Sequence, residues 1–457
     1  MQLHRVLYLR RPFMTLRKEA SQTFRLALPI IIGELAQMAL HIIDSAMVGA
    51  IDYKQLAATA LVINGVNIPF IFGIGMTISV SQMVSMANGR GDKKAVSHYL
   101  FNGFVLCAIT ALVISLSLVA GKNILRHLGQ DPVVVEHAIP FLELIALSLI
   151  PMLLFMTLKQ FADGLEQTRL AMIFSLLSMP VNIFLNWLLI FGNWGFPRLE
   201  LVGAGWATLI TRTLMFLSLL VVVLKGRHFS VYIAFRKTEW KLNRKTLKEL
   251  LGIGVPSSLQ IGMEAGAFAV TGILIGTIGA VEQAAHQIAL SCAAFTFMVS
   301  LGLSQAGSIR TSNSFGRKDW PKIASIGKST VLSAVVYGIF CAVLFVLFRH
   351  QLPVLFTKNG EVQAMAALLL LMAGIFQISD STQAIGAGLL RGIKDVKTPT
   401  VLIGIAYWVI GIPAGYVFAN VLEMGAMGMW LGLILGLTFA SVFLQTRFFR
   451  MIKRKTA

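Results

Sequence analysis

Residues 26–49 read LALPIIIGELAQMALHIIDSAMVG. It is apolar and exceeds the roughly 20 residues that a helix needs to cross a lipid bilayer. Glu34, Gln37, His41 and Asp44 follow one another at steps of three, four and three. A helix with this spacing carries all four side chains on one stripe.

This polar stripe has two interpretations. A carboxylate inside the membrane costs about 2.5–3.5 kcal/mol on insertion scales, so Asp44 is expected to face a wet cavity or a partner. The alternative is a stripe that only packs against other helices. Pro29 frees a backbone carbonyl near the start of the helix and allows it to bend. We favour a cavity-lining helix with an ionisable switch.

The composition excludes a soluble globular protein. Of the 457 residues, 56% are hydrophobic and only 13% are charged, which is typical of a polytopic membrane protein. The three cysteines are dispersed through apolar runs, so they make no disulfide or metal-binding pattern. We predict an all-α polytopic membrane protein with twelve transmembrane helices.

The twelve apolar spans divide into two sets of six around one long connection. They run near 25–50, 57–88, 96–120, 134–158, 168–192, 203–224, 247–279, 284–310, 325–348, 362–388, 399–420 and 425–447. The predicted organisation is a basic cytoplasmic leader (1–24), an N-lobe (25–224), a basic cytoplasmic linker (225–246), a C-lobe (247–447) and a basic cytoplasmic tail (448–457), with the lobes around a central cavity.

The distribution of basic residues predicts the orientation. The termini and the loops after even-numbered spans hold 32 of the 39 Lys and Arg, including Arg5, Arg10 and Arg11. The opposite loops hold six, and Arg212 lies within a span. By the positive-inside rule both termini are cytoplasmic. The net charge of +19 is therefore a topology signal, and no nucleic-acid partner is expected.

The two halves are repeats. When the sequence is shifted along itself so that Pro29 falls on Pro256, the Gly89-Arg90-x-Asp92 turn falls on Gly316-Arg317-x-Asp319. A shift greater by one position lays Gly164 on Gly392. Six spans per repeat give both halves the same orientation, an arrangement typical of secondary transporters that rock one bundle against the other.

Two further acids lie inside spans of the second half. Glu264 follows Pro256 by eight residues, and Asp380 lies 11 residues before Arg391, or about 16 Å along a helix. Together they predict an anionic pocket for cations. The alternative is that each is protonated and hydrogen-bonded for structure.

Uncharged oxygens could complete a cation site around Asp44. Asn182 and Asn186 are four residues apart and share a helix face, and Thr208 adds a hydroxyl in the next span. Hard cations prefer such oxygen ligands. Asn and Thr also join membrane helices by hydrogen bonds, so the alternative is a structural contact.

The sequence encodes no ATP motor and no enzyme. The nearest approach to a phosphate loop, Gly327-Lys328-Ser329, lacks the earlier glycine and the preceding strand. No arrangement of catalytic residues stands out. No cofactor is therefore expected.

Several motifs together resemble the multidrug and toxic compound extrusion (MATE) family, most closely its NorM-type bacterial branch. The resemblance spans residues 20–447. It is carried by LALPIIIGELAQ with IIDSAMVG, the GVP…E spacing that ends at Glu264, AAHQIAL, NIFLNWLLIFG and FQISDSTQAIGAGLLRGIKDVKTP.

The resemblance implies an antiporter of the bacterial inner (plasma) membrane that exports organic cations in exchange for H⁺ or Na⁺. Hydrophobic cations such as dyes and fluoroquinolones are the implied substrates, and we expect a monomer. In the family the positions of Asp44, Asn182, Asn186 and Thr208 form an N-lobe cation site, to which Gln37 and His41 are added here from the stripe. The positions of Glu264 and Asp380 form the C-lobe site.

Two departures bear on the coupling ion. Some relatives carry an aspartate where Asn186 stands, and sodium-coupled ones carry a tyrosine where Phe376 stands. Both losses weaken a Na⁺ site, at Asp44 or at Glu264 and Asp380, and favour H⁺. The alternative function is a lipid-linked oligosaccharide or lipid flippase of similar architecture, for which basic residues would be expected in the cavity.

Overall fold

The computed structural model describes residues 2–456, with side chains from Leu16 onward. The side chains of Arg5, Arg10 and Arg11, part of the predicted leader, lie outside the described ones. The described residues form helices and no strand, and twelve helices are long and apolar enough to cross a membrane. The prediction of an all-α protein with twelve transmembrane helices is therefore confirmed.

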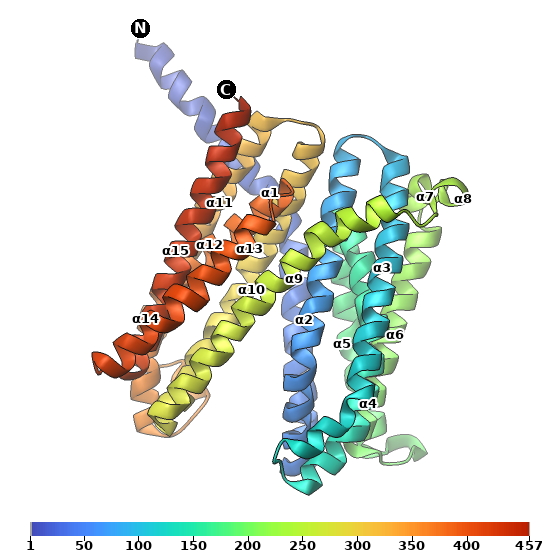
Figure 1. Cartoon of the computed structure of the whole chain (residues 1–457), viewed down its shortest axis with the longest axis vertical. Coiled ribbons are helices and arrows are strands. Elements are labelled where there is room, and N and C mark those ends of the chain that lie inside the picture. Colours follow the sequence, from blue (N-terminus) through green and yellow to red (C-terminus); the bar gives the residue numbers. More distant parts are fainter. Residues whose placement is uncertain (1, 457) are drawn as a thin grey trace. The chain divides into compact units, whose positions relative to one another are not determined.

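Eleven of the twelve spans are single α-helices, and the eleventh in chain order alternates α- and π-helix. The single helices are α1 (Gln2–Gly49), α2 (Tyr53–Gly89), α3 (Lys93–Ala120), α4 (Pro132–Gly164), α5 (Thr168–Phe191), α6 (Glu200–Lys225), α9 (Arg244–Ile278), α10 (Ala280–Gly316), α11 (Trp320–Phe348), α12 (Gly360–Gly392) and α15 (Gly425–Thr456). The composite span consists of α13 (Lys397–Gly404), η4 (Ile405–Gly411), α14 (Ile412–Tyr416) and η5 (Val417–Val421). Figure 1 shows the order of the helices along the chain.

The chain forms two compact units, here called the N-unit and the C-unit. The N-unit is Ile32–Ser258, and the C-unit comprises the residues up to Ile31 and those from Leu259 onward. Helices α1 and α9 therefore each contribute to both units. The predicted lobes divide the chain at the linker instead, and that division stays a prediction.

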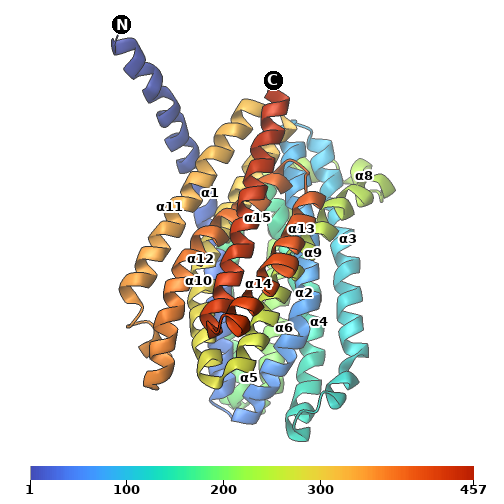
Figure 2. The same cartoon turned by 60° about the vertical axis from the view of Figure 1, so that its left-hand side comes forward.

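Within each unit one helix packs against most of the others. In the N-unit α4 contacts α2, α3 and α6, and in the C-unit α12 contacts α10, α11 and α15. Figure 2 shows α12 beside α10 and α11 from a second direction. Because α4 and α12 hold the same place in the two repeats, the repeat is present in the packing as well as in the sequence.

The turns repeat in conformation. Gly91 and Lys318, which correspond in the two repeats, both have positive φ, of 73° and 60°. Glu166 and Lys394, a second corresponding pair, both have φ of 64°. Asp92 and Asp319 then cap the following helices, each accepting a hydrogen bond from a backbone amide three residues on, at 2.9 and 3.0 Å.

Close helix approaches explain two of the repeated small residues. A Cβ on Gly164 would lie 2.8 Å from the carbonyl oxygen of Ser81, and one on Gly392 would lie 2.9 Å from that of Ser308. Contacts this short exclude any side chain. The Ser–Gly pair thus sets the crossing of α2 with α4 and of α10 with α12, and small residues at such crossings are common in membranes.

The predicted linker is folded onto the N-unit. It contains α7 (Arg227–Ile233) and α8 (Arg236–Glu239), and Phe229 in α7 is buried among side chains of α4 and α6. The Trp240 indole N–H donates to Ser97 Oγ at 3.2 Å, and the Asn102 amide donates to the Lys241 carbonyl at 3.1 Å. The linker is therefore part of a packed unit.

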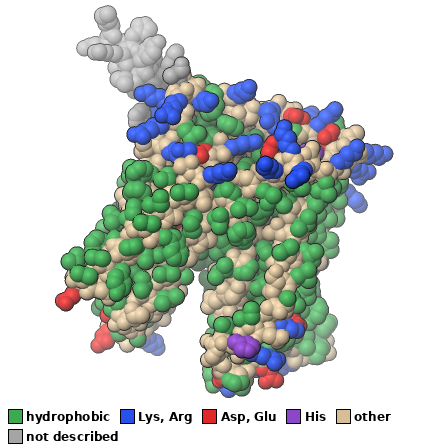
Figure 3. All heavy atoms as spheres, in the orientation of Figure 1, with side chains coloured by type: hydrophobic (Ala, Val, Ile, Leu, Met, Phe, Trp, Pro, Cys, Tyr) green, Lys and Arg blue, Asp and Glu red, His purple; other side chains and the backbone are tan. Residues whose placement is uncertain are grey.

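Polar and apolar side chains separate along the helices as a membrane requires. In Figure 3 hydrophobic side chains cover the sides of the helices, while Lys and Arg gather at one end of each unit. Many of the large side chains on the helix flanks are exposed, for example Ile109, Leu116, Phe340 and Leu347, each more than half exposed. Lipid is the environment in which such surfaces are stable.

Candidate functional site: two polar clusters inside the helices

The first cluster lies in the N-unit and joins α1, α5 and α6. The Asn186 amide nitrogen donates to Asp44 Oδ1 at 2.7 Å and to Asn182 Oδ1 at 2.9 Å. The Asn182 amide nitrogen in turn donates to Thr211 Oγ1 at 3.4 Å. Both asparagines are buried and Asp44 is half-buried. The structure therefore brings together three of the residues that the sequence singles out, Asp44, Asn182 and Asn186.

The other predicted N-lobe residues are placed differently. The Thr208 hydroxyl donates to the carbonyl of Ala204 in its own helix at 2.9 Å. Thr211, one turn further along α6, is the hydroxyl that meets Asn182. Gln37 is half-buried and His41 is exposed, and no hydrogen bond joins either to Asp44. Sequence reasoning missed Thr211, although its spacing from Thr208 would place it close to the same helix face.

A cation lies beside this cluster. Arg212 interacts electrostatically with Asp44 and His41, and its Nη1 donates to Ser148 Oγ of α4 at 2.7 Å. The side-chain oxygen of Asn186, Oδ1, is buried without a hydrogen-bond partner. The cluster thus offers one carboxylate and one free amide oxygen, with a guanidinium nearby.

The second cluster lies in the C-unit and joins α9, α12 and η4. The Tyr407 hydroxyl donates to Glu264 Oε1 at 3.1 Å. Asp380 is 3% exposed and interacts electrostatically with Glu264 and Tyr407. Both predicted C-lobe acids therefore lie in one cluster. Sequence reasoning missed Tyr407, which lies in a π-helical segment of the kind often found at functional sites.

Aromatic rings form a packed group that includes Tyr407. The Phe268 ring lies 5.9 Å from the ring of Phe376 and 5.9 Å from that of Tyr407, in edge-on geometry. Phe376 and Trp430 continue the group at 5.4 Å. The sequence predicts the loss of a hydroxyl at Phe376, and the structure places the Tyr407 hydroxyl against Glu264 from another helix.

A third group of buried charges in the N-unit was not expected. Lys159 Nζ donates to Glu34 Oε1 at 2.6 Å, and Asp163, which is fully buried, interacts electrostatically with both. Neither carboxylate oxygen of Asp163 has a hydrogen-bond partner. The sequence analysis ends the fourth span at residue 158, whereas α4 continues to Gly164. Lys159 and Asp163 therefore belong to the spanning helix α4.

A similar buried pair holds the first part of α1 in the C-unit. Arg310 of α10 forms a salt bridge with Glu19, and its Nη1 also donates to the Glu19 carbonyl at 2.8 Å. Its guanidinium further donates to Gln22 Oε1 at 2.7 Å. Pro29 is buried within the same part of α1, and the helix continues through it to Gly49.

Among residues 16–456 no group of three or more His, Cys, Asp and Glu side chains gathers as a metal site would require. The oxygens at the two clusters are instead a carboxylate with amides in the N-unit, and two carboxylates with a phenol in the C-unit. Such hard ligands suit protons and Na⁺ rather than transition metals.

The comparisons with known proteins agree in family and fold. The MatE family model matches residues 29–188 and again residues 256–417, once in each repeat. A probable multidrug resistance protein NorM of Rhizobium meliloti (strain 1021) is 35% identical over 441 residues, covering 94% of this chain and 93% of that protein. The multidrug resistance protein MdtK of Yersinia pseudotuberculosis serotype O:1b (strain IP 31758) is 31% identical over 450 residues, covering 96% and 97%.

Solved structures match over nearly the full length. A crystal structure of MATE in the bent conformation has a TM-score of 0.88 at 20% identity, over 97% of this chain and 98% of that one. An outward-facing multidrug resistance MATE family transporter also has a TM-score of 0.88 at 20% identity, over 96% and 97%. At this identity the structures establish the fold. The two matches to the family model and the relatives above 30% identity show that the chain belongs to the MatE family, on its NorM and MdtK side.

Proposed function

We propose that this chain is a multidrug efflux antiporter that exports hydrophobic organic cations in exchange for H⁺ or Na⁺ by alternating access. The single observation that carries the proposal is the half-buried Asp44, held by Asn186 at 2.7 Å inside a membrane-spanning helix. Relatives named as multidrug resistance proteins support the transport class over an enzyme and over the flippase alternative.

The N-unit cluster fits the coupling ion. An ionised Asp44 accepts a hydrogen bond from Asn186, and a protonated Asp44 can donate one, so the two charge states favour different partners. Na⁺ would find carboxylate and amide oxygens at the same place. Either ion neutralises Asp44, which changes the contacts of α1 with α5 and so the packing of the cluster.

The C-unit cluster fits the organic cation. When ionised, Glu264 and Asp380 offer negative charge, and the Phe268 ring lies against Tyr407, whose hydroxyl donates to Glu264. A hydrophobic cation gains from both, because a cation over an aromatic face is attracted by the ring electrons. Na⁺ at Glu264 and Asp380 is the alternative use of the same acids.

The energetics permit the exchange. Moving a drug tenfold uphill needs about 1.4 kcal/mol. One elementary charge that enters down 100 mV releases about 2.3 kcal/mol. One or two ions per cycle therefore suffice.

The proposal is tested by uptake of a fluorescent cationic dye into proteoliposomes of the purified chain, with pH and Na⁺ gradients imposed separately. We expect concentrative uptake under at least one gradient, and collapse of that uptake by the matching ionophore. Liposomes without protein are the control. Uptake that equals the control under both gradients would refute an ion-coupled antiporter.

The orientation belongs to the same proposal, which places both termini in the cytoplasm of a bacterial cell. Lys237, in α8, is exposed at the basic end of the N-unit. We expect an impermeant maleimide to label Lys237→Cys in inverted membrane vesicles and not in intact cells. Labelling in intact cells would reverse the topology.

A further inference from the structure

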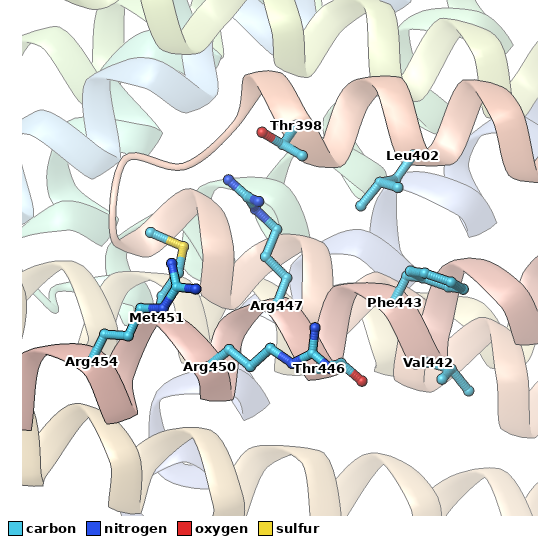
Figure 4. A pocket seen from close by; sticks show the side chains of 9 residues that line it. All are labelled: Thr398, Leu402, Val442, Phe443, Thr446, Arg447, Arg450, Met451 and Arg454. Atoms are coloured by element: carbon cyan, nitrogen blue, oxygen red, sulfur yellow. The ribbon is translucent and has the colours of Figure 1, made fainter.

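A basic pocket lies between α13 and α15 in the C-unit, away from both polar clusters. Its volume is about 540 Å³. Figure 4 shows the lining side chains, with Arg447 reaching from α15 toward the start of α13 and Leu402 pointing toward Phe443. The lining residues are Thr398, Leu402, Val442, Phe443, Thr446, Arg447, Arg450, Met451 and Arg454.

Two of the three arginines of the pocket keep their charge available. Arg447 forms a two-point salt bridge with Asp395, with its Nε at 2.5 Å and its Nη2 at 3.1 Å from the two carboxylate oxygens. Arg450 and Arg454 are exposed, and neither pairs with a carboxylate among the described side chains. The pocket therefore has a net positive charge that the protein itself does not neutralise.

The walls of the pocket change from polar to apolar along α15. Arg454 lies at one end, and Phe443 lies 11 residues before it, or about 16 Å along the helix axis. Phe443 and Val442 are 46% and 56% exposed. On the facing span Leu402 is half-buried and completes the apolar part of the lining.

The basic groups are not a general feature of this place in the repeat. Helix α6, the last of the first repeat, carries Lys225 as the one basic residue of its last turn. Helix α15 carries Lys453, Arg454 and Lys455 in its last turn, after Arg447 and Arg450. The charge that gathers at the pocket is thus additional to what the end of a spanning helix needs.

We propose that this pocket binds an anionic phospholipid, with its phosphate at Arg450 and Arg454 and its acyl chains along Leu402, Val442 and Phe443. Guanidinium groups bind phosphate oxygens with two parallel hydrogen bonds. Basic pockets between spanning helices at a membrane surface hold such head groups. A small free anion would use the arginines and leave the apolar wall unfilled, and an organic cation would be repelled.

The test is native mass spectrometry of the purified full chain titrated with phosphatidylglycerol, beside phosphatidylcholine of the same acyl chains. We expect phosphatidylglycerol to bind preferentially. The double variant Arg450→Gln/Arg454→Gln should bind it about 30-fold more weakly, because it removes both guanidinium groups that hydrogen-bond the phosphate inside the pocket. The matched control is Lys453→Gln/Lys455→Gln, which removes the same charge from the same end of α15 without touching the pocket.

Three results would overturn the proposal. One is equal loss of binding in the two double variants, which would indicate diffuse attraction. Another is displacement of the lipid by inorganic phosphate at equal concentration, which would indicate a free-anion site. The third uses the wild-type chain, so it needs no variant to fold. It is labelling by a photoactivatable phosphatidylglycerol that occurs only outside residues 398–402 and 442–454.

Discussion

Both polar clusters include the first spanning helix of their repeat, but they are built from different groups. In the N-unit a single carboxylate, Asp44, lies among asparagines and near Arg212. In the C-unit two carboxylates and a phenol lie beside packed aromatic rings. The alignment that lays Pro29 on Pro256 also pairs Gln37 with Glu264 and Asp44 with Thr271, so each repeat carries an acid where the other carries a neutral polar group.

The two repeats therefore share their helix crossings but differ in the polar groups that the helices carry. The crossings that need Gly164 and Gly392 are the same in both units. The positions of the acids differ between the units. A carboxylate in a spanning helix costs free energy, so its presence indicates a functional site. The proposed function accordingly places the coupling ion at the N-unit cluster and the organic cation at the doubly acidic C-unit cluster.

The substitution Asp44→Asn should have the largest effect. It removes the charge and keeps an oxygen that can accept from Asn186. We expect gradient-driven dye uptake in proteoliposomes to fall to that of empty liposomes, while dye binding to the purified protein persists. Asp52→Asn is the control, because Asp52 precedes α2 without a side-chain capping bond. Wild-type uptake in Asp44→Asn would end the assignment of Asp44 as the coupling residue.

The double variant Glu264→Gln/Asp380→Asn should affect substrate binding first. Removing buried charge that faces a cation typically costs about 2 kcal/mol or more, so affinity for a monovalent cationic dye should fall by about 30-fold or more. Equilibrium dye binding to the purified protein measures this loss, with Glu361→Gln in the first turn of α12 as an exposed control. Unchanged affinity would mean that these acids do not hold the drug.

Removing the cation of the buried charges in the N-unit should destabilise the protein more than removing one of its acids. Lys159→Gln leaves Glu34 and Asp163 without a cation, and breaking a buried pair in this way costs about 3–5 kcal/mol. Glu34→Gln should cost less, because Asp163 remains beside Lys159. Thermal unfolding of the two purified variants against wild type checks the order. Equal losses would show that Asp163 does not compensate.

The sequence predicts the helices well because each span is long, apolar and bounded by basic loops. It also predicts the acids, since Asp44, Glu264 and Asp380 stand alone in apolar surroundings. It missed Lys159 because a lysine near a span boundary is indistinguishable from a loop residue until helix α4 is seen to continue to Gly164. It missed Tyr407 because the hydroxyl meets Glu264 from a different helix, far along the chain, and helix periodicity does not reach that far.

The Tyr407 hydroxyl gives a smaller effect than the acids do. Tyr407→Phe removes one hydrogen bond to Glu264 and keeps the ring that packs on Phe268. A hydrogen bond to a charged group contributes about 1.5–3 kcal/mol, so dye affinity should change by about tenfold or more. Tyr416→Phe, on the exposed side of the same span, is the control. Equal affinities in the two variants would show that the Tyr407 hydroxyl does not contribute to dye binding.

The smallest effect distinguishes two hydroxyls of α6, one turn apart. Both hydroxyls donate to a backbone carbonyl of α6, Thr211 at 2.7 Å and Thr208 at 2.9 Å. Thr211 in addition accepts a long hydrogen bond of 3.4 Å from Asn182. A bond of that length is weak. Thr211→Val keeps the branched shape and should lower gradient-driven uptake only about two- to fivefold, in line with the net value of about 1 kcal/mol for a neutral hydrogen bond or less.

Thr208→Val, the matched variant, should transport at the wild-type rate, because its hydroxyl meets only the Ala204 carbonyl. Initial rates of dye uptake, normalised to protein recovered in the liposomes, measure both variants together. The reverse order would return Thr208 to the position that the family resemblance implies for it. It would also mean that α6 presents a different face to Asn182 during transport from the one it presents in this structure.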